Sequence, residues 1–223
     1  MCKAPASESA HVRVRFWQLT PKWEELANKL RHVVKVAYVD TEAGPTPNAI
    51  GQIQGTPTIK AFIPKRSSAK NEKIVVDYDQ SREVDSLMRY ATSKMPSFVE
   101  VLDTPDVLRR FEAKATEWGL PRVLVLSNKA GGQSASTLKA LSAEYRRRVL
   151  IGEVRSSKLP EVAKRHGVTS YPTLLCFASG GAAAPTSRFE GKEPTYRRLD
   201  GFVGKCALRK PVLKKPADEK EEL

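Results

Sequence analysis

The sequence contains few cysteines, and none of them stand at a spacing typical of a paired site. The three cysteines of the 223 residues are Cys2, Cys176 and Cys206. An odd count without pair spacing does not describe a disulfide framework. We therefore expect Cys176, in an apolar run, to be an inert core residue and Cys2 to be incidental. Cys206 lies among basic residues that favour the thiolate form, so a reactive thiol there is the alternative to an inert one.

Long apolar runs are absent as well. No stretch approaches the ~18 residues that a membrane-spanning helix requires. Residues 1–20 also lack the apolar core of a secretory signal peptide, which is typically about 7–15 residues long. The sequence therefore predicts no membrane span and carries no recognisable secretion signal.

Acidic residues are the minority, and the formal net charge is +13 with a pI near 9.7. Such a balance fits a nucleic-acid-binding protein. However, the basic clusters are spread along the chain, without a recognition helix, a zinc-ligand set or an aromatic RNA motif. We interpret them as a solvated surface that can attract acidic protein segments, within the ~8 Å screening length of physiological salt. Nucleic acid is the less favoured partner, and no cofactor or metal is expected.

What the sequence does contain is one short phrase twice. The segments Pro57–Phe62 and Pro172–Phe177 each begin with a proline that opens an apolar run, and each run ends in phenylalanine. Because proline lacks the N–H that a central strand donates, it belongs at the first residue of a strand. The two prolines are 115 residues apart (172 − 57), which is about one domain length. The repeat therefore indicates a duplicated unit.

Each copy of the phrase stands in the same context of helices and strands. Apolar residues at i, i+3, i+4 and i+7 predict a helix that begins at Pro21, with Trp23, Leu26 and Leu30 on its buried face. In order along the chain, the sequence predicts helices over 21–30, 82–94, 137–145 and 195–206, and strands over 33–39, 74–78, 149–154 and 188–190. Strands that alternate with helices in this way indicate an α/β fold.

This order resembles the second half of a thioredoxin fold, and three phrases are similar to those of the protein disulfide isomerase family. They are Leu19–Ala27, Val34–Asp40 and Gly55–Phe62. The resemblance implies an α/β fold of two tandem thioredoxin-like domains, each with a mixed sheet flanked by helices. It also implies a cis peptide bond before the strand-opening proline, in a loop that faces the redox site.

The redox cysteines of that family are missing from this chain. Counting back five and eight residues from Pro21 reaches Phe16 and Arg13, neither of which can form a thiolate. In the second domain no cysteine lies between Arg122 and Leu138, and no Cys-x-x-Cys occurs anywhere. We therefore name no catalytic residue and expect no dithiol–disulfide exchange by the family mechanism.

The first domain also lacks an obvious central strand. His11–Phe16 alternates like a half-exposed strand, whereas a central parallel strand should be almost wholly apolar. Burying Arg13 and Arg15 there without partners would cost several kcal/mol each. We interpret the sequence as an N-terminally incomplete version of a longer protein, with a degenerate first domain as the alternative.

The last four residues, Lys220, Glu221, Glu222 and Leu223, are similar to retrieval signals of the Lys-Asp-Glu-Leu class. We therefore expect the endoplasmic reticulum lumen as location, a retrieval receptor as one partner, and a signal peptide upstream of Met1. An ordinary acidic tail is the plainer interpretation.

These observations combine into one functional prediction. We expect a partial thioredoxin-like domain over 1–95, a redox-silent one over 96–208 and a disordered tail over 209–223. The function implied is that of a protein-folding factor of the disulfide isomerase type, whose parent protein is catalytic although this chain lacks the dithiol. A redox-inactive, chaperone-like protein that binds unfolded or disulfide-containing clients is the alternative. The predicted substrate-binding residues are Gly55, Thr56, Pro57, Tyr171 and Pro172.

Overall fold

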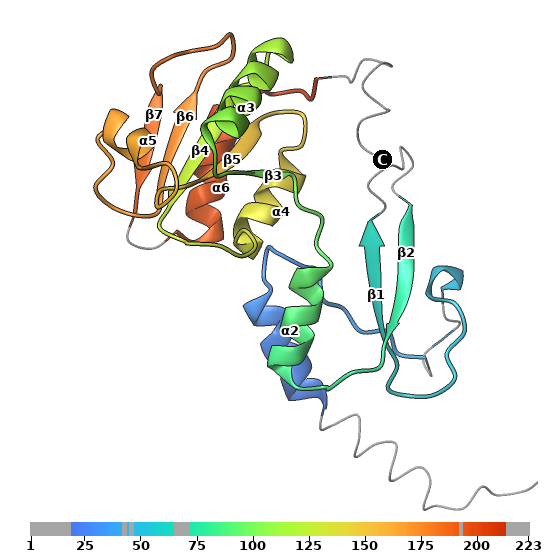
Figure 1. Cartoon of the computed structure of the whole chain (residues 1–223). Helices are drawn as coiled ribbons and strands as arrows, with labels where there is room; N and C mark the ends of the chain where they lie inside the picture. Colours follow the sequence, from blue (N-terminus) through green and yellow to red (C-terminus); the bar gives the residue numbers. More distant parts are fainter. Residues whose placement is uncertain (1–18, 42–43, 45–46, 65–71, 192–193, 213–223) are drawn as a thin grey trace, which may run out of the picture. The chain divides into compact units, whose positions relative to one another are not determined.

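A computed structural model describes residues 19–41, 44, 47–64, 72–191 and 194–212 of the chain. The chain divides into two compact units, residues 1–95 and 96–223 (Figure 1). No helix in the described ranges is long and apolar enough to cross a membrane.

The first unit combines helices with a two-stranded sheet. A helix spans residues 19–29. The 3-10 helix η1 (Asn48–Ile50), the strands β1 (Ile59–Pro64) and β2 (Lys73–Tyr78), and the helix α2 (Val84–Ser93) follow. β1 and β2 pair antiparallel, with Ile59 opposite Tyr78 and Phe62 opposite Val75.

The core of the first unit lies between its helices and its sheet. Leu26 and Leu30 are buried together with Tyr78, Val84 and Leu87. Trp23, Val36 and Ile59 are half-buried against this cluster. The predicted apolar stripe of the helix that starts near Pro21 is therefore confirmed.

The predicted strand over residues 33–39 is wrong. Residues 35–40 have no regular secondary structure, and Tyr38 is exposed. A strand requires a neighbour that exchanges backbone hydrogen bonds with it. In the described part of the first unit the sheet consists of β1 and β2 alone. This apolar, β-branched run therefore does not form a strand. Its Ala37 carbonyl accepts a side-chain hydrogen bond instead, from Trp23 Nε1 at 3.3 Å.

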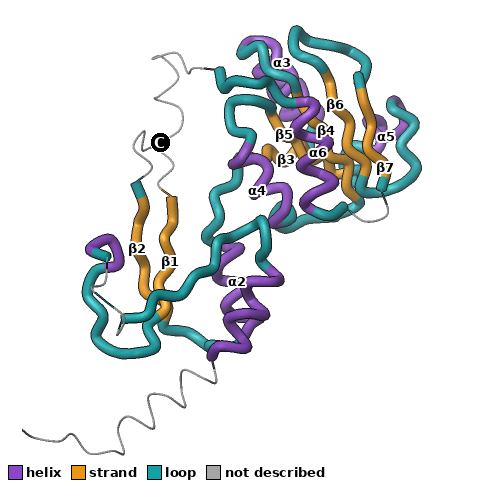
Figure 2. The backbone as a smooth tube through the Cα atoms, turned by 180° about the vertical axis from the view of Figure 1, so that it is seen from behind, coloured by secondary structure: helices purple, strands orange, loops and turns teal. Residues whose placement is uncertain are grey.

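The second unit has a five-stranded sheet between helices (Figure 2). In chain order its elements are β3 (Val99–Leu102), α3 (Pro105–Glu117), β4 (Arg122–Ser127), α4 (Ser136–Glu144), β5 (Leu150–Arg155), α5 (Pro160–Arg165), β6 (Thr173–Phe177), β7 (Ser187–Glu190) and α6 (Tyr196–Cys206). The strand order is β3-β5-β4-β6-β7. β3, β5 and β4 are parallel, whereas β6 runs antiparallel to both β4 and β7.

Alternate residues of the central strand β4 point into two separate cores. Leu124 and Leu126 pack in the cluster that contains residues of α3 and α5. Val123 and Val125 pack in the other cluster, which contains residues of α4 and α6. Because strand side chains alternate between faces, a strand covered on both sides is buried along its whole length and is largely apolar. β4 and β6 are fully buried, as such a position requires.

The helices and strands predicted from sequence in the second unit are present with shifts of at most one residue at their ends. The predicted stripe of Leu138, Leu141 and Tyr145 on α4 is buried. Gly152 on β5 shows how closely the sheet packs, because a Cβ there would lie 2.6 Å from Leu102 Cδ1 and 2.9 Å from Phe111 Cζ.

Candidate functional site

The candidate site begins with two loops that enter β1 and β6. The Thr56–Pro57 and Tyr171–Pro172 peptide bonds are both cis, as the family resemblance implies. In the first loop the Thr58 hydroxyl donates a hydrogen bond to the Gly55 carbonyl. In the second loop the Thr173 hydroxyl donates to the Ser170 carbonyl at 2.7 Å. The hydroxyl of the threonine after each proline therefore bonds the carbonyl three residues before that threonine, and the two loops share this local structure.

The loop residues predicted to bind substrate are accessible. Gly55 and Thr56 are exposed, and Pro57 is half-buried. Arg82, just before α2, donates from Nη2 to the Pro57 carbonyl at 3.1 Å and fastens this loop to the rest of the first unit.

In the second unit Tyr171 is 39% exposed and Pro172 is half-buried. Thr173, the next residue, pairs with Leu126 near the carboxyl end of β4. The loop therefore lies at the end of the sheet from which the chain leaves β4 toward α4. That connection, residues 128–135, is where the family's cysteine pair would fall, and it contains no cysteine.

Buried polar side chains occupy this end of the sheet. Glu153 on β5 is 1% exposed and accepts hydrogen bonds from the hydroxyls of Ser127 at 3.0 Å and Ser134 at 2.6 Å. Arg155, 2% exposed, lies with Nη2 3.7 Å from Glu153 Oε2. We call Ser127, Ser134, Glu153 and Arg155 the Ser–Glu–Arg network.

Arg155 also fastens the connection after β4. It donates from Nη1 to the Gly131 carbonyl at 3.1 Å and from Nη2 to the Gly132 carbonyl at 2.7 Å. Gly132 has a φ of +82°, which glycine adopts without the strain that a Cβ would bring. The guanidinium therefore holds two backbone carbonyls and one carboxylate at once, and the loop is fixed without any thiol.

Sequence reasoning missed this network. Its signal was the charged Glu153 inside the predicted strand 149–154, followed two residues later by Arg155 of opposite charge. Buried charges are usually paired, so two opposite charges spaced i, i+2 point to the same face of a strand and predict an internal partner.

The expectation of unpaired cysteines at positions 176 and 206 is wrong, although Cys176 does lie in the core. Cys176 of β6 and Cys206 at the end of α6 form a disulfide with their Cα atoms 6.0 Å apart. Neither is therefore a free core thiol or a reactive thiol. The two cysteines are 30 positions apart in the sequence, with no spacing that indicates pairing, and the return of the chain through β7 and α6 brings them together.

Other predicted features lie outside the described residues. They include Arg13, Phe16 and the retrieval-like end Lys220, Glu221, Glu222 and Leu223. Most of the predicted tail, residues 213–223, does too. Within the part of the chain that is described, no group of three or more His, Cys, Asp and Glu side chains is arranged to hold a metal ion.

The fold and the sequence both resemble known proteins. A crystal structure of ERdj5 superposes with a TM-score of 0.58 at 18% identity over 83% of this chain and 24% of that one. A Dictyostelium discoideum protein named as a protein disulfide-isomerase is 25% identical over 190 residues, which cover 84% of this chain and 44% of the relative. Protein disulfide-isomerase 2-3 of Arabidopsis thaliana is 36% identical over 73 residues, or 33% of this chain and 15% of the relative. No protein-family model matches.

The fold is therefore α/β and thioredoxin-like, with a mixed sheet flanked by helices. The sequence relatives named as protein disulfide-isomerases support a likeness of this chain to the protein disulfide isomerase/thioredoxin-like family. The chain spans less than half of the length of the curated relatives it matches first.

Proposed function

We propose that this chain is the client-binding part of a protein-folding factor of the disulfide isomerase type, and that it binds clients without covalent chemistry. The observation that carries the proposal is the end of the second sheet. It keeps an exposed cis-proline loop, while the Ser–Glu–Arg network closes the connection where a dithiol would stand. Any thiol–disulfide exchange by the parent protein then depends on cysteines outside these 223 residues.

The two cis-proline loops supply the binding groups in this proposal. Thr56 and Tyr171 precede the prolines and are exposed. An extended client segment gains main-chain hydrogen bonds when it lies along an exposed strand-like edge, and this gain does not depend on its sequence. The exposed Tyr171 ring adds a surface for apolar client side chains. Unfolded and disulfide-containing proteins are therefore the expected clients.

The proposed location is the lumen of the endoplasmic reticulum, with a retrieval receptor as a further partner. The Cys176–Cys206 disulfide supports an oxidising compartment, because disulfides persist there and are rare in the cytosol. The retrieval-like end Lys220–Leu223 supports the same compartment.

The proposal is tested with the purified chain and a labelled, unfolded client protein. We expect the chain to suppress client aggregation but to rearrange a scrambled-disulfide substrate no faster than its thiol background. Tyr171→Ala should weaken client binding ~fivefold, since an aromatic contact contributes about 1 kcal/mol. Tyr38→Ala, which removes a ring that is 77% exposed outside both loops, is the matched control.

Two results would overturn the proposal. One is isomerase turnover that disappears in Cys206→Ser. The other is client binding that Tyr171→Ala and Tyr38→Ala weaken equally, since the loop would then contribute nothing specific.

A further inference from the structure

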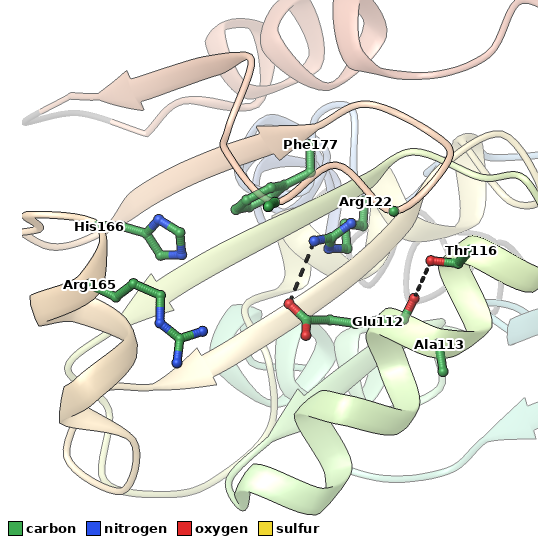
Figure 3. Close-up of a pocket in the computed structure, with 9 residues that line it drawn as sticks. Glu112, Ala113, Thr116, Arg122, Arg165, His166 and Phe177 are labelled. Atoms are coloured by element: carbon green, nitrogen blue, oxygen red, sulfur yellow. Dashed lines mark hydrogen bonds and ion pairs between the residues drawn. The ribbon is translucent and has the colours of Figure 1, made fainter.

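The second unit has an open hollow of about 420 Å³ that belongs to neither cis-proline loop (Figure 3). Arg122 opens β4 and pairs with Phe177 at the close of β6, so both lie at the end of these strands opposite Pro172. The side chains that line the hollow and carry charge or a ring are Glu112 of α3, Arg122, Arg165 and His166 at the end of α5, and Phe177.

Arg122 is an unusual side chain for such a wall. It is only 5% exposed, and its guanidinium lies 4.5 Å from the centre of the Phe177 ring. Nη2 donates to the Ala182 carbonyl at 2.8 Å and stands 3.6 Å from Glu112 Oε1. Nε is buried without a hydrogen-bond partner in the described part of the chain. Burial lowers the pKa of Arg122, as expected for a charge that its surroundings only partly compensate.

Positive charge exceeds negative charge around the hollow. Figure 3 shows the side chains of Arg165 and His166 facing Arg122 and Glu112 across it. Glu112 is the single acidic side chain of the lining, and its carboxylate is next to Arg122. No described carboxylate lies within ion-pairing distance of Arg165, which is exposed. With neutral His166, the lining therefore carries one uncompensated positive charge.

The charges around the hollow also affect the pKa of His166. Its pKa is lowered first by burial and then by the charge of Arg165, with further lowering from Arg122 and Arg188 and an opposing effect of Glu112. Arg188 of β7 is itself paired with Glu190 and bonded to the carbonyls of His166 and Gly167. The groups that face His166 from α3, β4, α5 and β7 are therefore three cations and one anion.

We propose that this hollow is a binding site for a single carboxylate, held by the Arg165 guanidinium in the field of Arg122. A guanidinium matches a carboxylate with two parallel hydrogen bonds. One carboxylate neutralises the excess charge of the lining, whereas a phosphate dianion would exceed it. Ala113 and Ala183 of the lining are exposed and offer apolar surface to the carbon chain that bears the group. The carboxylate comes either from a small organic acid or from an acidic side chain of a protein segment.

The full chain is titrated with acetate, with a short capped peptide that contains one glutamate, and with inorganic phosphate, all at constant ionic strength. The readout is the proton resonance of the His166 ring, one of only three histidines in the chain. We expect saturable shifts with the carboxylates and a rise in the pKa of His166 when the site is filled. Peptide binding at least ~tenfold tighter than acetate would identify protein segments as the source, and equal binding would identify free acids.

Variants at exposed and half-buried positions distinguish binding in the hollow from non-specific attraction by the positive surface. Arg165→Gln should weaken carboxylate binding roughly tenfold or more, because a charge-assisted hydrogen bond is lost. Arg197→Gln, on α6 at the opposite face of the sheet, removes the same charge and should change nothing. Glu112→Gln should tighten binding, since it removes the competing carboxylate. Shifts that do not saturate, equal loss in Arg165→Gln and Arg197→Gln, or tighter binding of phosphate would each overturn the proposal.

Discussion

At the scale of single residues, the second unit depends on charges that are buried and paired. Glu153 and Arg155 are almost completely removed from water, yet each is surrounded by partners: two serine hydroxyls for the carboxylate and two backbone carbonyls for the guanidinium. A buried ion pair contributes little net free energy when compared with an apolar pair of the same shape. Removing only one of the two charged side chains lowers stability strongly, because the remaining charge stays buried without its partner.

Glu153→Gln should therefore destabilise the second unit. We expect the free energy of unfolding to fall by about 3–5 kcal/mol, since Arg155 would lose its only carboxylate within ion-pairing distance among the described residues. Urea titration followed by tryptophan fluorescence measures the change. Glu117→Gln, an exposed change of the same kind on α3, should leave the free energy of unfolding within about 0.5 kcal/mol. Equal stability of the two variants would contradict the assigned role of the network.

At the scale of elements, the disulfide joins the central part of the sheet to the last helix. Cys176 lies in β6, between β4 and β7, and Cys206 ends α6. α6 also packs through Leu199 and Val203 on the same core cluster as Cys176. The covalent link therefore holds a helix where apolar packing already places it, and its main effect is on the unfolded chain.

Reduction should lower the stability of the second unit without changing its fold. For a loop of about 30 residues the loss in free energy of unfolding is roughly 3–4 kcal/mol. Urea titrations of the second unit's transition with and without dithiothreitol, and of the Cys176→Ala/Cys206→Ala variant, measure it. Cys2→Ser is the control for the loss of a cysteine. A transition midpoint that is unaffected by reductant would show that the bond does not form in the protein.

Sequence patterns predict some elements of the two units correctly and others not. Both prolines marked the approach to a strand, because proline lacks the N–H that a strand interior donates, although β1 begins only at Ile59 and β6 at Thr173. Residues 33–39 and 149–154 have similar apolar patterns, but only the second run becomes a strand, β5. β5 has β3 and β4 on its two sides. A strand's existence depends on neighbours that a local pattern does not contain.

At the scale of the whole molecule, the chain carries a large positive charge on two units with equivalent cis-proline loops. Long-range attraction raises the local concentration of oppositely charged partners and is screened by salt. The proposed client binding should therefore favour acidic segments, in addition to the proposed binding of extended backbone at the loops.

Salt should separate these two contributions. Between ~0.05 and ~0.5 M sodium chloride we expect the affinity for an acidic, unfolded client peptide to fall about tenfold or more, because the Debye length shortens from over 10 Å to a few ångströms. The affinity for a neutral peptide of the same length should change less than about twofold. Fluorescence anisotropy measures both. If the affinities of the two peptides depended equally on salt, charge attraction would not contribute to client binding.

The sequence by itself determined the duplicated proline motif, the apolar stripes of the helices and the absence of a Cys-x-x-Cys pair. Each of these follows from local chemistry: a missing N–H, a helical period, or a residue type that is not there. Only the tertiary structure decided that Cys176 meets Cys206, that Glu153 and Arg155 close the connection after β4, and that residues 33–39 form no strand. These outcomes depend on which groups distant in the chain become neighbours, and burial and pairing are properties of that neighbourhood.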